Sequence, residues 1–156
     1  MKRGHEKQLT VCLCLILLNL SFIWGNSLLP GPQSAEVSGG IMELLEELLE
    51  SVAPNGEHLI RKLAHFSEFA CLGLLFAWLF QILGQSRFHV FTMPLLFGSM
   101  AALVDETLQV LTPERGPSVV DVWIDIAGVT TGILLLLLGL CLWQTRKSKS
   151  NGGNKT

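Results

Sequence analysis

Four predominantly apolar runs of about 16 to 22 residues constrain this chain more than any other feature of its sequence. An α-helix needs such a length to cross about 30 Å of hydrocarbon at about 1.5 Å per residue. The runs cover residues 9–24, 63–83, 90–111 and 122–143. Because the chain has only 156 residues, 49% of them hydrophobic and 15% charged, no separate soluble catalytic domain fits beside them. The sequence therefore excludes an ordinary soluble enzyme and predicts an all-α membrane protein.

The spacing of the runs predicts four transmembrane helices in an antiparallel bundle, because the last three are joined by short connections. Basic residues precede the first run, as in a signal peptide, but no clear cleavage site follows, which favours a retained anchor. The predicted organisation is a cytoplasmic segment 1–8, a first span 9–29, an extracytoplasmic segment 30–60, a core 61–143 that holds three spans, and a cytoplasmic tail 144–156.

Residues 41–52 show an amphipathic pattern within the long extracytoplasmic segment. Apolar side chains recur there at helical spacing, with four glutamates on the opposite side. The pattern predicts a short outer amphipathic helix that is too short to span a membrane. This helix either lies on the membrane surface or covers the bundle as a lid, and its acidic side disfavours contact with anionic lipid.

The positions of lysine and arginine predict the orientation of the chain, since these residues are in excess on the cytoplasmic side. With both termini inside, eight of the eleven are cytoplasmic, and Arg61, Lys62 and Arg115 are outside. Twelve of the thirteen acidic residues then lie on or near the outer side. We therefore predict a multi-pass plasma-membrane protein with its N- and C-termini inside. The net charge of −2 gives no indication of a nucleic-acid partner.

Ten polar residues lie at the predicted outer ends of spans two to four, where burial in a membrane is costly unless a side chain is paired or hydrated. At about 1.5 Å per residue, the polar residues of each span cover about 5 to 6 Å of depth. The polar residues of all three spans therefore fit within one layer of the membrane about 10 Å thick. We predict that these residues form a binding site: Arg61, Lys62, His65, Glu68, Asp105, Glu106, Gln109, Arg115, Asp121 and Asp125.

Small residues accompany the acids on two helix faces. Gly98 and Ala102 share the face of Asp105, at a spacing of three or four residues. Gly128 and Gly132 share the face of Asp125 and form a Gly-x-x-x-Gly pattern, which lets another helix approach closely. Three helices are therefore expected to point polar faces at a common point.

The expected cluster contains five carboxyl groups against three fixed cations, so its net charge cannot remain bare in a low-dielectric region. Three solutions remain open: one or two carboxyls keep their protons, His65 is charged, or a cation from outside completes the site. A metal site built from His65, Glu68 and the aspartates is one possibility, but its ligand types are generic and no dense motif such as His-Glu-x-x-His is present, so the sequence does not specify one. Polar helix ends are also ordinary, and Asp121 fits a simple capping role beside Ser118.

Four stretches of the chain resemble the VanZ-like family of small bacterial membrane proteins, and together they cover residues 60–140. The stretches run from Arg61 to Phe69, Asp105 to Gln109, Pro113 to Gly116 and Asp121 to Gly132. The sequence departs from the family pattern at three positions, with Phe69 in place of tyrosine, Glu114 in place of glycine and Asp125 in place of asparagine. The resemblance implies a bacterial plasma-membrane protein, and the founding member of the family is associated with resistance to the glycopeptide teicoplanin.

Three functions are compatible with these residues. The first is binding of, or action on, a lipid-linked cell-wall intermediate or a lipidated glycopeptide, with the outer arginines and lysine holding phosphate. The second is an intramembrane acid–base enzyme, in which Glu106 or Asp105 is the general base and His65 the acid or orienting partner. The third is an accessory membrane subunit whose polar cluster only fixes helix packing. The sequence does not decide whether the protein is catalytic, and it does not identify a cofactor.

Overall fold

The computed structural model describes residues 2–29, 56–113, 116 and 118–152. In this part of the chain there are four helices and no strand: α1 (Lys2–Ser27), α3 (Gly56–Ile82), α4 (Arg87–Val110) and α5 (Val119–Gly152). Each helix contains a stretch long and apolar enough to cross a membrane, which confirms the predicted all-α membrane fold. The amphipathic helix predicted at 41–52 lies outside the described residues.

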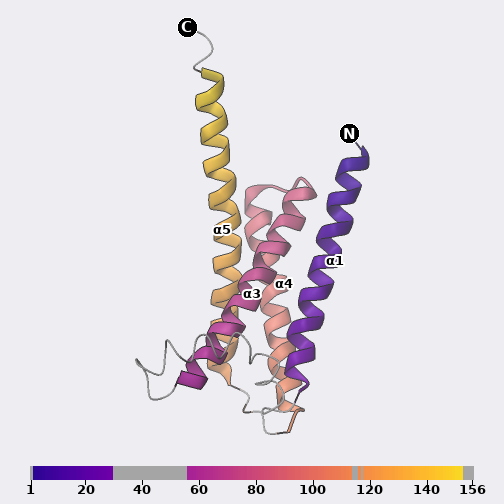
Figure 1. The fold of residues 1–156 in the computed structure, drawn as a ribbon, viewed down its shortest axis with the longest axis vertical. Helices are drawn as coiled ribbons and strands as arrows, with labels where there is room; N and C mark the ends of the chain where they lie inside the picture. Colours follow the sequence, from indigo (N-terminus) through magenta and orange to yellow (C-terminus); the bar gives the residue numbers. More distant parts are fainter. Residues whose placement is uncertain (1, 30–55, 114–115, 117, 153–156) are drawn as a thin grey trace.

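The helices lie side by side and alternate in direction, so the bundle is antiparallel (Figure 1). The start of α1 and the end of α5 lie at one end of the bundle, which we call the termini end. We call the opposite end the acidic end; α1 and α4 finish there, α3 and α5 begin there, and it holds Ser27, Asp105 and Asp125. The start of α1 and the end of α5 are thus on the same side of the bundle, while the assignment of that side to the cytoplasm stays a prediction.

The closest helix contact joins α3 and α5, and glycines make it possible. A methyl group at Gly128 would overlap the backbone carbonyl of Phe66, and one at Gly132 would overlap that of Ala70. From the other helix, a methyl group at Gly73 would overlap the backbone of Val129. These overlaps confirm the predicted Gly-x-x-x-Gly contact and bring the two backbones together. Asp125, one turn before Gly128, is thereby brought against α3.

Helix α4 completes the interior. Its face toward the other helices carries Gly98, Ala102, Asp105 and Gln109, all of which are buried, as predicted. A tight turn through Gly84, with a left-handed φ of 69°, joins α3 to α4. In that turn, the amide of Gln85 donates to the carbonyl of Phe80 and ends α3. Ser86 then caps α4, because its hydroxyl accepts from the amide of His89.

Helix α1 packs against α3 and α4, on the side of the bundle away from α5. The indole of Trp24 donates to the carbonyl of Ala101 at 3.4 Å, and the buried Cys12 lies against α3. The opposite face of α1 exposes large apolar side chains such as Leu17 and Leu18, each about two-thirds exposed. Such a face is suited to lipid rather than to water.

Helix α5 continues well beyond the apolar run that predicted it. The sequence places a tail after Trp143, whereas the helix extends to Gly152. At about 1.5 Å per residue, its 34 residues are longer than the hydrocarbon core is thick. The reason is local: no proline or glycine interrupts residues 140–150, so a polar sequence prolongs the helix after the apolar run has ended.

Candidate functional site

Asp105 of α4 is the centre of the polar interior at the acidic end. Its side chain is fully buried and is held by two neutral donors. The hydroxyl of Ser27, at the end of α1, donates to one carboxylate oxygen at 2.6 Å, and the amide of Gln109 donates to the other at 2.9 Å. These bonds fix the orientation of the carboxylate between α1 and the bundle interior.

Two further side chains approach Asp105 from the neighbouring helices. Nδ1 of His65, on α3, lies 4.0 Å from the carboxylate and forms an ion pair with it when the ring is protonated. Asp125, on α5, is 1% exposed. One potential ligand atom from each of His65, Asp105 and Asp125 lies within 4.8 Å of the other two. The predicted convergence of three helices on one point is therefore present, and we call these three residues the three-helix cluster.

The surroundings of Asp125 are strongly acidic. Asp105, Glu106, Asp121 and Glu68 all lie close enough for their negative charges to repel a charge on this carboxylate. Within the described residues, no hydrogen-bond donor reaches its Oδ1 atom. A buried carboxylate oxygen without a donor is rare in folded proteins, because water no longer compensates its charge.

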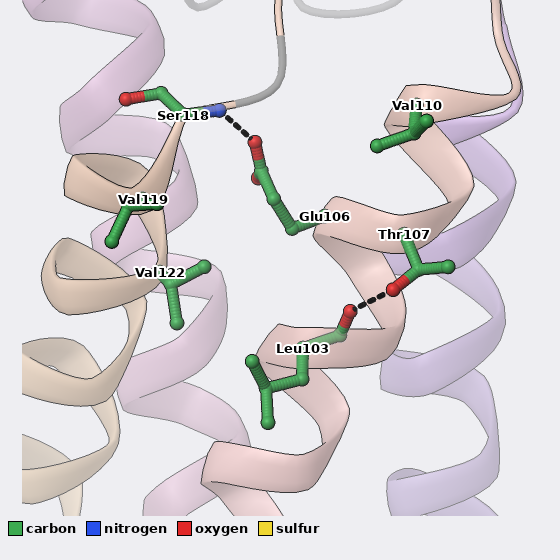
Figure 2. Close-up of a pocket in the computed structure, with 7 residues that line it drawn as sticks. All are labelled: Leu103, Glu106, Thr107, Val110, Ser118, Val119 and Val122. Atoms are coloured by element: carbon green, nitrogen blue, oxygen red, sulfur yellow. Dashed lines mark hydrogen bonds between the residues drawn. The ribbon is translucent and has the colours of Figure 1, made fainter.

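The carboxylate of Glu106 connects α4 with the start of α5 through a hydrogen bond. Glu106 is 8% exposed, and its carboxylate accepts a hydrogen bond from the backbone amide of Ser118 (Figure 2). The hydroxyl of Ser118 accepts from the amide of Val120, as an N-cap residue does. In a capping box, a side chain three positions after the cap, here Asp121, bonds the amide of the cap residue. Here that bond comes instead from Glu106 on another helix.

Asp121 pairs with a different residue. Its carboxylate lies 3.4 Å from the ammonium group of Lys62, and both side chains are partly exposed at the edge of the cluster. Glu68 lies on α3 less than one turn after His65 and is half-buried. The structure thus brings eight of the ten predicted residues to one end of the bundle. Arg115 lies outside the described residues, and of Arg61 only the backbone, within α3, is described.

A cavity of about 300 Å³ lies beside the cluster, between α4 and the start of α5. Apolar side chains form most of its wall, and Glu106 and Ser118 contribute polar atoms at one edge (Figure 2). Its lining residues are Leu103, Glu106, Thr107, Val110, Ser118, Val119 and Val122. The cavity opens on the outer surface of the bundle, since Leu103, Val110 and Val119 are each more than half exposed.

The sequence reasoning missed the contribution of α1 to this site. Ser27 is fully buried against Asp105, and Thr112 lies within hydrogen-bond distance, 3.0 Å, of the carbonyl oxygen of Ser27. A signal was present, because Asn26 and Ser27 are polar residues at the predicted outer end of the first span. The depth argument used for the other spans would have found them.

The arrangement offers two kinds of chemistry. The three-helix cluster presents carboxylate and imidazole atoms in a buried position, where they can hold a cation or exchange a proton. The cavity presents an apolar wall ending at a carboxylate and a hydroxyl, which suits a molecule with an acyl chain and a polar head.

A model of the VanZ/LLP1 family matches residues 8–142. The match includes most of α1, so it extends beyond the four motif stretches found in residues 60–140, and it confirms the resemblance seen there. No curated protein and no solved structure matches the chain.

Proposed function

This chain belongs to the VanZ/LLP1 family of proteins, and from that premise we propose that it binds an acylated amphiphile at the acidic end of the bundle. The ligand is a lipidated glycopeptide or a lipid-linked cell-wall intermediate, and its binding contributes to teicoplanin-type resistance. In this proposal the acidic end faces the outside of a bacterial plasma membrane, as the lysine and arginine distribution predicts.

The cavity between α4 and α5 is the observation that carries this proposal. Its volume of about 300 Å³ is at the lower end of the range of small-molecule sites, which fits part of an acyl chain rather than a whole antibiotic. Because Leu103, Val110 and Val119 border it on the exposed surface, a chain can enter from the lipid without crossing the bundle.

The charges beside the cavity favour one of the two ligands. Among the residues that line the cavity, Glu106 is the charged one, and Asp121, at the start of α5, pairs with Lys62. Amide, hydroxyl and ammonium groups of a glycopeptide donate hydrogen bonds to carboxylates, whereas phosphate is repelled by them. A lipidated glycopeptide is therefore the first candidate. A lipid-linked intermediate is the second, and for that ligand Lys62, together with Arg61 and Arg115 as predicted from the sequence, supplies the positive charge.

Susceptibility measurements test the cavity directly. A Gram-positive host expresses the wild-type chain, Val110→Trp, Glu106→Gln or Leu96→Trp, with equal membrane levels verified. Tryptophan at position 110 fills the cavity, and glutamine at 106 keeps an acceptor for the Ser118 amide while it removes the charge. Leu96→Trp is the matched control, because Leu96 is also on α4 and is 53% exposed but does not line the cavity.

We expect the wild type and Leu96→Trp to protect the host from teicoplanin, and Val110→Trp and Glu106→Gln to protect it less. Vancomycin, which lacks an acyl chain, should be equally effective in all strains. Full protection by an abundant Val110→Trp variant would show that the ligand does not bind in the cavity. If the wild type gives no protection, the glycopeptide ligand fails, and photo-crosslinking with a lipid-linked precursor tests the second candidate with the same variants.

A further inference from the structure

The three-helix cluster is separate from the cavity and has the composition of a metal-binding site. Its members are one histidine and two aspartates, each from a different helix. Asp105 is fully buried, Asp125 is 1% exposed, and the side chain of His65 is 12% exposed. Imidazole with two carboxylates is a donor set that divalent transition cations accept, and Zn²⁺ binds both histidine nitrogen and carboxylate oxygen in three-ligand sites.

The distances suit a cation of that size. Bonds of about 2.0 to 2.2 Å place neighbouring ligand atoms of a tetrahedral site about 3.4 Å apart. The separation of 4.0 Å between His65 Nδ1 and the Asp105 carboxylate is close to this value, and no pair of the three ligand atoms is more than 4.8 Å apart. Small rotations of side chains are therefore enough to close the site, and the backbones need not move.

Asp125 supplies a second and independent observation. Its Oδ1 atom is buried and receives no hydrogen bond from any described residue, although Asp125 belongs to the three-helix cluster. Four other carboxylates repel a charge at this position. A divalent cation would give this oxygen a partner and would also offset the negative charge of Asp105, whereas a proton would neutralise a single carboxyl.

The bonds around Asp105 match those that support metal ligands in proteins. Ligating carboxylates are themselves held by hydrogen bonds, which orient them toward the metal. Here the Ser27 hydroxyl and the Gln109 amide hold the two oxygens of Asp105. A carboxylate oxygen has a second lone pair, so the oxygen bonded by Gln109 can still bind a cation.

We propose that a ring nitrogen of His65 and one carboxylate oxygen each of Asp105 and Asp125 bind a single Zn²⁺ ion at the acidic end. Three protein ligands leave a fourth coordination position for water or another oxygen donor. This site does not depend on amphiphile binding, because none of its three ligands lines the cavity. The sequence alone does not predict it, since ligands at 65, 105 and 125 form no compact motif.

Metal binding to the full-length chain in lipid nanodiscs tests the proposal. The protein is first stripped with a chelator, and Zn²⁺ is then titrated against a chromophoric competitor, with Co²⁺ as a spectroscopic substitute. We expect one Zn²⁺ per chain and a Co²⁺ spectrum of a site with nitrogen and oxygen ligands. Asp125→Asn and His65→Gln should each weaken binding by about tenfold or more.

Controls separate this site from other histidines and from loss of the fold. His89 is exposed at the termini end, so His89→Gln should bind Zn²⁺ like the wild type. Thermal unfolding shows whether each variant is folded, and Asp105→Asn replaces any variant that is not. The proposal is overturned if the folded wild type shows no saturable binding. It is also overturned if folded Asp125→Asn binds as tightly as the wild type, or if His89→Gln removes the bound ion.

Discussion

The interiors of the two ends of the bundle differ in polarity, although the same helices form both. At the termini end the interior is apolar, with Ala77 and Val90 fully buried and Phe80 stacked on Phe97 at 6.1 Å between ring centroids. Its polar side chains are on the surface, where Arg87 donates to Gln144 at 2.6 Å. At the acidic end the interior itself is polar.

Burial makes the difference between the ends explicit. In the described part of the chain, the buried polar side chains all lie at the acidic end: Asn26, Ser27, Asp105, Glu106, Gln109, Thr112 and Asp125. A helix end near water can leave such groups exposed at no cost. Two buried aspartates lower the stability of a bundle unless something compensates their charge. The contrast indicates that apolar packing at the termini end maintains the fold, and it is the reason why both proposed sites are placed at the acidic end.

The largest expected effect concerns the contact between α3 and α5, which supports both ends. Gly132→Ala forces a methyl group against the carbonyl of Ala70, so the helices must separate. We expect a loss of about 1 to 3 kcal/mol in the free energy of unfolding, measured by SDS titration in mixed micelles. Gly139→Ala on the same helix is the control, because, apart from the adjoining backbone of its own helix, no atom lies within 4 Å of the added methyl group. Equal effects of the two substitutions would show that the close packing of α3 and α5 at Gly132 does not stabilise the bundle.

Ser27→Ala tests the cost of a polar interior. It removes the donor to one oxygen of the fully buried Asp105, and an unsatisfied buried acceptor costs about 1 to 3 kcal/mol. The corresponding change at the termini end is Gln144→Ala, which removes an exposed partner of Arg87 and should alter stability by about 0.5 kcal/mol or less. Circular-dichroism melts of both variants give the comparison. If Gln144→Ala costs as much as Ser27→Ala, the proposed distinction between the two ends is wrong.

Lys62→Met should have the smallest effect. Its ammonium group pairs with Asp121 at 3.4 Å, but the side chains are 44% and 26% exposed, so water and salt screen the pair. We expect a loss below about 1 kcal/mol that shrinks further in high salt, measured by the same SDS titration at two ionic strengths. A large effect that does not depend on salt would place this pair in the polar interior rather than at its edge.

The sequence predicted the fold well because a helix that crosses a membrane requires a long apolar stretch. Spans were identifiable from apolar length, and the spacing of Gly128 and Gly132 was enough to predict the close helix contact. The exact end of α5 was not predictable from hydropathy, because a polar sequence can continue a helix that leaves the membrane. The residues 41–52, for which a lid was one expectation, lie outside the described part of the chain.

The residues of the site were predictable from the sequence, but the hydrogen bonds and ion pairs between them were less so. Helical spacing placed Asp105 and Asp125 on inward faces. The face on which a residue lies depends only on the rotation of about 100° per residue in an α-helix. Spacing within one helix cannot show which partner a side chain finds on another. For that reason the bond from Ser27 to Asp105 was missed, and Asp121, expected to act beside the Ser118 cap, proved to pair with Lys62.

If an amphiphile binds in the cavity as proposed, the bond between Glu106 and Ser118 makes the start of α5 responsive to it. The carboxylate that accepts the Ser118 amide is also part of the cavity wall. A guest that takes this carboxylate oxygen competes with the amide, and the first turn of α5 then loses its anchor on α4. Occupancy and helix order are consequently linked in both directions: a guest that displaces the amide loosens α5, and a change that loosens α5 frees the carboxylate for the guest.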